Sequence, residues 1–176
     1  MKLAASILAA CLALFSPYLL ADEIFVAVDG SRQGRFVGEA KIRGLEDKIQ
    51  AIAFSHEVAA FDVASGRAMS RAQHRQLTIT KRVGGASPQF FSALTTGELL
   101  KRVTIDVVRP DANGVNALVY QILLDGATVT RIAQRMDIPS PSTNVGYVED
   151  ISFIYQRITV SSPVSRRNAM TEWVVK

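Results

Sequence analysis

Cysteine, histidine and tryptophan are scarce in this sequence. The 176 residues include one cysteine, two histidines and one tryptophan. Cys11 lies in an N-terminal segment that we expect to be removed, so no disulfide, thiol nucleophile or cysteine-bound metal is expected in the mature chain. The motifs G-x-S-x-G and H-E-x-x-H are both missing. By omission, the sequence argues against an enzyme, and we predict a non-enzymatic protein without a cofactor.

The few residues that could carry chemistry do not form a recognisable site. Ser55, His56 and Glu57 are consecutive. Neighbouring residues on a strand point to opposite faces, so Ser55 and His56 cannot meet as a catalytic pair. We expect His56 to be packed or interfacial, and His74 to be solvated at the entrance of a strand. The carboxylates are spread over different segments, so a carboxylate pair or a metal site stays open, but nothing selects its residues.

A glycine-containing stretch, RVGGASP, precedes a predicted helix and invites comparison with a phosphate-binding loop. The order G-x-x-x-x-G-K-[ST] is missing, and Lys81 precedes the glycines instead of following them. We therefore interpret the stretch as a strand-to-helix turn. The 20 Lys and Arg residues are interspersed with 16 Asp and Glu. No basic run alternates with aromatic residues, so no nucleic-acid partner is expected.

Residues 1–21 have the layout of a secretory signal. Lys2 is followed by an apolar run, and the small residue Ala21 stands at its end, although Leu19 makes the cleavage site imperfect. A retained membrane anchor and a misassigned start codon are the alternatives. Residues 22–176 are expected to form a single domain, which can bury about 70% of its unfolded surface and needs no covalent staple.

Alternation of apolar and polar residues predicts a mainly β protein. Residues 31–47 are expected to form a long loop, with a short β segment around Phe36 and Val37. Gly126 lies inside a long strand and indicates a bulge or a bend. No strand is assigned to the tail. The predicted strands cover 23–29, 48–61, 74–83, 101–110, 116–136 and 147–162, with a turn region at 62–73.

One short helix, at about 88–96, interrupts this pattern. Ser87 is a preferred N-cap, Pro88 is tolerated at the first helical position, and Gly97 permits the left-handed turn that ends a helix. A helix of about ten residues is too short to be stable alone, so its apolar stripe around Phe90 must pack against the barrel or sandwich that the strands predict. Strands with two apolar faces also need an outer cover, for which a neighbouring subunit is the natural candidate.

Five segments occur in a specific order. The most distinctive is LTITKRVGGASPQFFSALTTGELLKRVTIDVVR at 77–109, with a Thr-Lys strand end, A-S-P, a short helix, a glycine and a strand. Across 22–176 the order resembles the Hcp family, the haemolysin-coregulated proteins that form the tube of bacterial type VI secretion systems. The other segments are DEIFVAVDG at 22–30, IAFSHEV at 52–58, VEDISFIYQRITV at 148–160 and TEWVVK at 171–176.

The resemblance implies an antiparallel two-sheet β-barrel with one short helix at its side. It implies a non-enzymatic subunit of hexameric rings that stack into a tube inside a contractile sheath. Such a tube is capped by a spike protein, is expelled on contraction and can carry effectors, so the protein would be secreted. The resemblance also places the family's ring-stacking loop at 31–47, with Arg32, Arg35, Phe36 and Val37 as its residues.

The signal-like start departs from the family, whose members normally leave the cell through the secretion apparatus itself. A true signal would direct the protein to the periplasm. The alternative function is therefore an exported Hcp-like domain that binds a ligand or a carbohydrate, or acts as an adaptor, and the Pro/Ser loop at 139–146 motivates it. A third hypothesis, an exported hydrolase, requires His56 to be catalytic.

Overall fold

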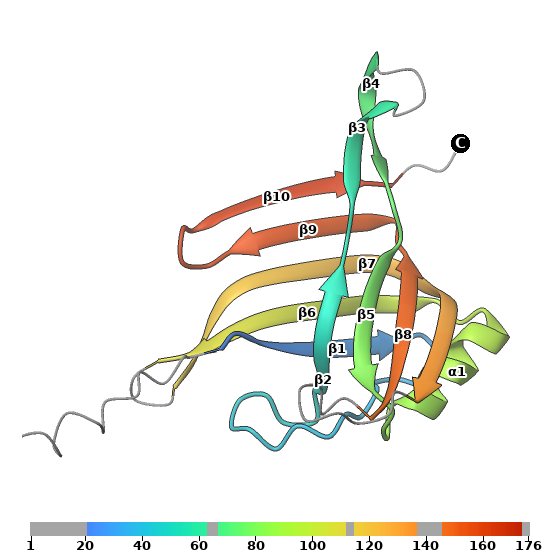
Figure 1. Ribbon diagram of the computed structural model, residues 1–176, viewed down its shortest axis with the longest axis vertical. Helices are drawn as coiled ribbons and strands as arrows, with labels where there is room; N and C mark the ends of the chain where they lie inside the picture. Colours follow the sequence, from blue (N-terminus) through green and yellow to red (C-terminus); the bar gives the residue numbers. More distant parts are fainter. Residues whose placement is uncertain (1–20, 63–66, 112–114, 137–145, 174–176) are drawn as a thin grey trace, which may run out of the picture.

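The chain contains ten strands and one helix within the residues that the structure, a computed structural model, describes (Figure 1). The described residues are 21–62, 67–111, 115–136 and 146–173. The predicted signal, apart from Ala21, and most of the loop at 139–146 lie outside them. In chain order the elements are β1 (Glu23–Gly30), β2 (Ile49–Ser55), β3 (Val58–Asp62), β4 (Arg67–His74), β5 (Leu77–Arg82), α1 (Ser87–Thr96), β6 (Leu100–Pro110), β7 (Asn116–Met136), β8 (Tyr147–Ile154), β9 (Arg157–Ser162) and β10 (Arg167–Glu172).

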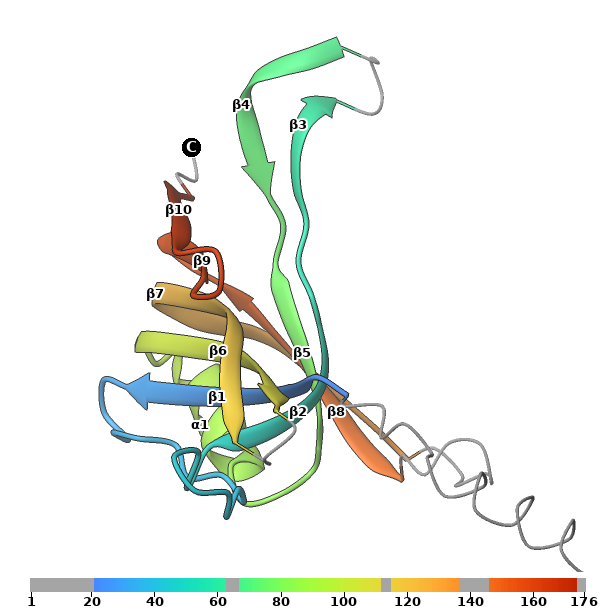
Figure 2. The same cartoon turned by 90° about the vertical axis from the view of Figure 1, so that its left-hand side faces the viewer.

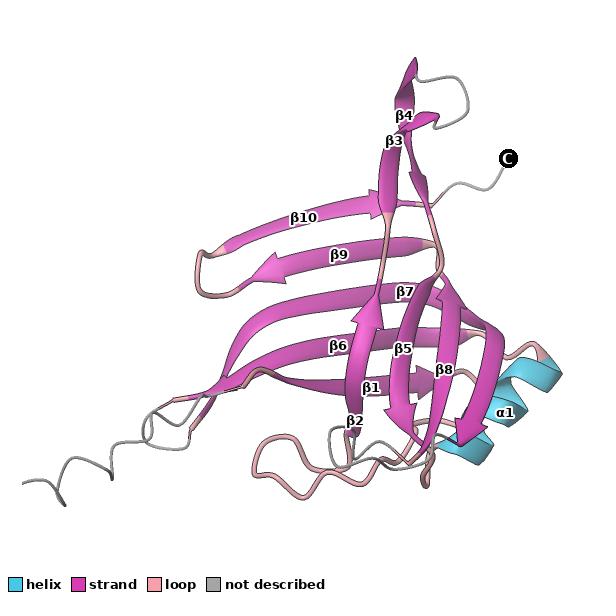
Figure 3. Ribbon diagram, viewed as in Figure 1, coloured by secondary structure: helices cyan, strands magenta, loops and turns pink. Residues whose placement is uncertain are grey.

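Six of the strands close into an antiparallel barrel. The large sheet has the order β10-β9-β7-β6-β1-β2-β5-β8, and a further pairing of β7 with β8 closes it. β9 and β10 continue this sheet beyond β7, whereas β3 and β4 form a separate two-stranded hairpin. Figures 1 and 3 show this hairpin projecting beyond the barrel. The predicted β-barrel with a single helix is confirmed.

The long strand β7 allows closure because it changes partners along its length. Residues 121–125 pair with β9, and residues from 128 to 136 pair with β8. Gly126 lies between these two segments and has a φ of +62°. A Cβ atom at this position would lie 2.7 Å from the side chain of Gln156. The positive φ favours glycine at this bend, and the prediction at Gly126 is confirmed.

Helix α1 lies at one end of the barrel (Figures 1 and 2). Its buried residues Phe90 and Ala93 pack into the hydrophobic core. Phe90 is fully buried, and its ring lies edge-on to Phe36 and Phe153, with centroids 5.1 and 6.2 Å away. On the outer side of the helix, Phe91 is 60% exposed. A helix of 10 residues is thus held by one buried stripe, as its length requires.

Local sequence predicts the C-terminal end of α1 correctly and its N-terminal end incorrectly. Gly97 ends the helix in the left-handed conformation, with a φ of 61°, as predicted. The prediction of Ser87 as N-cap is wrong, because Ala86 occupies the cap position without a side-chain hydrogen bond and Ser87 is the first helical residue. The Ser87 hydroxyl instead joins a buried polar network that involves residues distant in sequence.

Two strands escaped the sequence pattern. β4 occupies most of the region 62–73 that was predicted as a turn, and β10 lies in the tail. Every residue of β10 is exposed, so no alternation marks it, and the strand forms by pairing its backbone with β9. The predicted single strands at 48–61 and 147–162 are also wrong. His56 and Glu57 divide the first into β2 and β3, and Tyr155 and Gln156 divide the second into β8 and β9.

Candidate assembly surfaces

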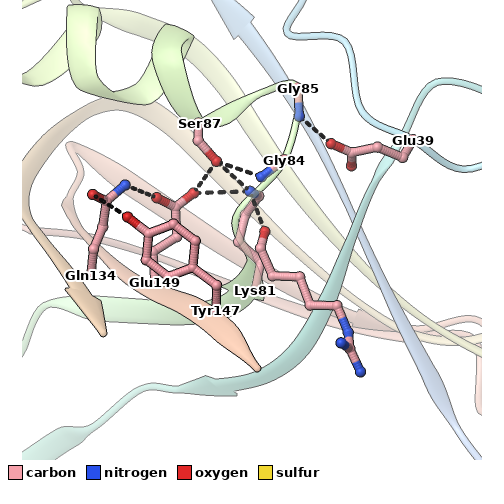
Figure 4. A network of polar contacts seen from close by, with 9 residues as sticks. Glu39, Lys81, Gly84, Gly85, Ser87, Gln134, Tyr147 and Glu149 are labelled. Carbon is pink, nitrogen blue, oxygen red and sulfur yellow. Dashed lines mark hydrogen bonds and ion pairs between the residues drawn. The ribbon is translucent and has the colours of Figure 1, made fainter. Parts of the chain in front are cut away.

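A buried charged network attaches helix α1 to the barrel wall (Figure 4). The Lys81 Nζ atom donates hydrogen bonds to Glu149 Oε1 at 2.9 Å and to Ser87 Oγ at 3.0 Å, and the Ser87 hydroxyl donates to Glu149 Oε1 at 2.6 Å. The side chains of Lys81 and Glu149 are 1% and 0% exposed. Gln134 Nε2 donates to the second carboxylate oxygen at 2.9 Å. The network joins β5, β7, β8 and α1 at one point.

The charges in this network are compensated. Burial by itself raises the pKa of Glu149, but hydrogen bonds from Gln134, Ser87 and Lys81 and the charge of Lys81 lower it below its ordinary value of 4.5. A serine beside a lysine and a carboxylate resembles a nucleophile, but the Ser87 residue is only 6% exposed. The arrangement therefore stabilises the helix position and does not present a hydroxyl to a substrate.

A second buried carboxylate holds the start of the loop at 31–47. Glu98 is 1% exposed and accepts hydrogen bonds from the backbone N–H groups of Arg32 at 2.6 Å and Gln33 at 2.9 Å. The Gln33 side chain donates to the other oxygen at 2.7 Å. A Cβ atom at Gly30 would lie 2.6 Å from Glu98 Oε1, so this close approach requires glycine. Burial raises the pKa of Glu98, but these hydrogen bonds outweigh it and lower the pKa overall.

Of the four residues predicted for ring stacking, Arg32 belongs to this anchor through its backbone N–H and the other three follow it, but the four do not share one surface. Arg32, Arg35 and Val37 are exposed, and Arg35 lies 3.6 Å from Asp29 in an ion pair. Phe36 is 1% exposed and packs on the helix, so it belongs to the core. The predicted β segment there consists of an isolated bridge between Asp29 and Arg35. Three of the four side chains are thus available to another molecule.

The same loop covers the outer face of β1 and β6. Phe25, Ala40, Leu45 and Val108 form a small apolar cluster of their own. Beside it, Lys48 Nζ lies 2.7 Å from Asp106 Oδ2 in a largely buried ion pair. The sequence predicted a neighbouring subunit as the cover for strands with two apolar faces. On this part of the barrel the chain covers its own outer face.

Two histidines and a tyrosine meet where the β3–β4 hairpin leaves the barrel. The Tyr155 hydroxyl lies 2.6 Å from His56 Nε2 and 2.9 Å from His74 Nδ1. Trp173 stacks on the His74 ring, with centroids 6.0 Å apart. The prediction that His74 is solvated is wrong, since it is 8% exposed. His56, predicted to be packed or interfacial, is half-buried and packs against Tyr155. Burial raises the pKa of Tyr155 to about 12, so its hydroxyl stays protonated.

An apolar groove runs beside this cluster, between the base of β3 and the strands β9 and β10. Its volume is about 230 Å³. β10 is the edge strand of the large sheet, and Met170 on it is 62% exposed. Edge strands carry unpaired backbone N–H and C=O groups and so accept a further strand. The groove is lined by His56, Val58, Ile158, Val160, Ala169, Met170 and Thr171.

These features define a class of protein: a helix-capped antiparallel β-barrel with a projecting hairpin and an open sheet edge. Among the described residues, no three His, Cys, Asp or Glu side chains gather as metal ligands would. Within the same ranges, no helix has the length and apolar character needed to cross a bilayer. The surfaces that the described residues offer are suited to contacts with other proteins.

The family described as "Type VI secretion system effector, Hcp" matches residues 25–161. The chain belongs to this Hcp family, which confirms the resemblance seen in the sequence and makes it a secreted protein of type VI secretion. It is 30% identical to the "Major exported protein" of Pseudomonas aeruginosa over 166 residues, which cover 88% of this chain and 96% of that protein.

Solved structures agree with this assignment. The secreted protein Hcp3 from Pseudomonas aeruginosa matches with a TM-score of 0.71 and 27% identity, over 88% of this chain and 100% of that one. A crystal structure of an Hcp protein matches with a TM-score of 0.79 and 24% identity, over 89% of this chain and 100% of the other. The second likeness supports the fold alone.

Proposed function

We propose that this protein is a non-enzymatic structural subunit of a type VI secretion system, which forms hexameric rings that stack into the expelled tube and carry effectors. The observation that supports this most directly is the open β10 edge beside an apolar groove, in a chain of the Hcp family. A spike protein, a contractile sheath and effectors are the partners that this role requires, and it requires no cofactor.

The proposal assigns two surfaces to two kinds of contact. Contacts within a ring use the edge of β10 and the groove, because an apolar groove next to unpaired backbone groups favours the addition of a neighbouring chain. Contacts between rings use the exposed side chains of Arg32, Arg35 and Val37. Glu98 and the buried Phe36 hold that loop in place, so its exposed residues are presented without a large ordering cost.

The oligomeric state of the purified mature protein tests the proposal. Sedimentation velocity and negative-stain imaging should show six-chain rings, and Met170→Glu should convert them to monomers by placing a charge in the groove. Val164→Glu is the matched control, because Val164 is 75% exposed and does not line the groove. Val37→Glu should leave rings intact but prevent their stacking. A wild-type protein that stays monomeric at micromolar concentration would contradict the proposal.

A periplasmic ligand- or carbohydrate-binding domain, or an adaptor, is the second candidate. A cavity of about 560 Å³ favours it, because the lining includes the aromatic ring of Trp173 beside His74 and Glu57. Apolar aromatic faces with nearby polar groups suit sugar rings. This candidate predicts a monomer whose melting temperature rises with a glycan or small molecule from a panel. No shift across the panel would count against it.

The signal-like segment 1–21 distinguishes the two candidates, because its removal, which its layout predicts, is expected for the periplasmic candidate and not for the tube subunit. N-terminal sequencing of the protein from its native cell, together with cell fractionation, tests this directly. Asp22 as the first residue in a periplasmic fraction would support cleavage and the periplasmic role. An internal start, or an intact segment 1–21, would contradict it and favour secretion through the type VI apparatus.

A further inference from the structure

The two histidines occupy the two hinges of the projecting hairpin. His56 lies between β2 and β3, on the way out, and His74 is the last residue of β4, on the way back. They are the only histidines among the 176 residues. Between the same hinges, the Arg75 backbone N–H donates to the Glu57 carbonyl oxygen at 3.0 Å. Both imidazoles contact Tyr155, which follows β8 of the barrel. One hydroxyl group beside the barrel strand β8 thus contacts both hinges of the hairpin.

The shared hydroxyl can form one hydrogen bond to each of two neutral imidazoles. The Tyr155 O–H can donate to an unprotonated nitrogen of one histidine while its oxygen accepts an N–H from the other. The contacts of 2.6 and 2.9 Å have the length of such bonds. A proton added to the accepting imidazole removes the acceptor of the Tyr155 hydroxyl. A second proton places two cationic rings with centroids 6.4 Å apart.

We propose that His56, Tyr155 and His74 form a pH-sensitive clasp, which fixes the β3–β4 hairpin against the barrel at neutral pH and releases it in mild acid. This device goes beyond the proposed assembly function, and its His56 also lines the groove that the proposed function assigns to contacts within a ring. Protonation is expected to change how the hairpin is oriented relative to the barrel. The barrel should stay folded, because its own strand pairings do not involve these three residues.

The surroundings of the clasp favour the neutral rings. Burial lowers the pKa of both imidazoles below the ordinary 6.5, and the nearby His74 lowers that of His56 further. On the β10 side of His56, the groove is lined by uncharged residues. Among the side chains that the structure describes, Glu57 and Arg75 line the cavity beside His74, and an ion pair joins Arg157 and Glu172, which lie close in sequence to Tyr155 and Trp173. In each of these pairs one positive charge accompanies one negative charge.

Trp173, the only tryptophan of the chain, is a built-in reporter for the test. It stacks on His74 and lies edge-on to Tyr155 at 5.1 Å, so protonation of the clasp should change its emission. The mature protein would be titrated from about pH 8 to about pH 5, the range in which histidine acts as a switch. We expect a fluorescence step below pH 6.5, with unchanged far-UV circular dichroism and faster amide exchange in β3 and β4, corrected for the intrinsic effect of pH.

Two variants make the test decisive. The double variant His56→Gln, His74→Gln should fold but lack the step. Tyr155→Phe should speed exchange of the hairpin amides at neutral pH by about fivefold, because a net hydrogen bond is worth about 1 kcal/mol. Tyr147→Phe is the control, since that hydroxyl is on an exposed residue of β8. The proposal is overturned if wild type shows no step, if the step coincides with loss of far-UV signal, if the double variant retains it, or if Tyr155→Phe exchanges like wild type.

Discussion

The helix end of the barrel and the root of the hairpin both bury polar groups, but they compensate them differently. At the helix end, Lys81, Glu149 and Glu98 are buried as charges and are paired with opposite charge or with backbone donors. At the hairpin root, His56 and His74 share one neutral hydroxyl. Charged networks are costly to break because the remaining charge has no partner, whereas neutral contacts are weaker and depend on protonation. The contacts at the helix end should therefore persist over a wide pH range, whereas those at the hairpin root should respond to pH.

The largest expected effect is the loss of the buried cation. Lys81→Met should lower the free energy of unfolding by about 3 kcal/mol, since removal of one partner leaves the other charge buried. Urea unfolding followed by circular dichroism measures this. Lys101→Met, on an exposed lysine of β6, should stay within about 0.5 kcal/mol of wild type. The double variant Lys81→Met, Glu149→Leu should recover stability, and a double variant as unstable as the single one would contradict the account.

The anchor of the loop at 31–47 should have a somewhat smaller effect. Glu98→Gln should cost about 2 kcal/mol, because hydrogen bonds between a charged acceptor and backbone donors become neutral ones. Hydrogen exchange should accelerate at the amides of Arg32 and Gln33, which donate to Glu98. Glu46→Gln in the same loop is the control. The Glu46 carboxylate also accepts a backbone hydrogen bond, from Gly44, but it is exposed to water, so stability should stay within about 0.5 kcal/mol and exchange at these amides should not change. If Glu98→Gln and Glu46→Gln changed stability and amide exchange equally, the prediction that the buried carboxylate matters more than the surface one would be contradicted.

The hairpin root should be less costly to disturb. Tyr155→Phe removes only a hydroxyl and should lower the free energy of unfolding by about 1 kcal/mol. Tyr147→Phe should be nearly neutral by the same urea measurement, because that tyrosine is 44% exposed. A loss for Tyr155→Phe as large as that for Lys81→Met would show that the two regions do not differ as argued.

Acid should destabilise the two regions at different pH values. The loss of unfolding free energy should be smaller in the pH range where the histidines titrate than in the range where the buried glutamates titrate. The lowered pKa of each histidine means that the folded state binds fewer protons than the unfolded state below about pH 6.5, so stability falls as the pH drops through that range. Glu98 and Glu149 also have lowered pKa values, so their contribution is present above pH 4.5 and is lost at more acidic pH. Unfolding free energies measured by urea at a series of pH values should fall in two stages, and the double variant His56→Gln, His74→Gln should lack the first stage.

Local signals predicted much of the fold because they act within a few residues. Gly97 ends α1 and Gly126 bends β7 as expected, since a left-handed backbone at either position favours glycine whatever surrounds it. Strands with alternating residues, such as β6, were equally visible. β10 was missed because all its residues are exposed and its existence depends on pairing with β9. The same reasoning failed for β4, whose strand forms by pairing with β3.

The candidate surfaces were harder to predict because their residues are brought together over long distances in the chain. Arg32 and Glu98 are 66 positions apart, and His56 and Tyr155 are 99 positions apart. No spacing rule connects such residues, and a histidine or glutamate by itself has no pattern that marks it as buried. A glycine next to a turn, as at Gly30, is a weak signal that another group approaches the backbone closely.

The sequence by itself determined the family, the β class and the single helix, because these follow from local alternation, capping residues and the order of specific segments. Only the tertiary structure decided that Phe36 belongs to the core while Arg32, Arg35 and Val37 face outward, and that one tyrosine joins both hinges of the hairpin. The physical reason is that burial and hydrogen-bond partners are properties of the folded chain.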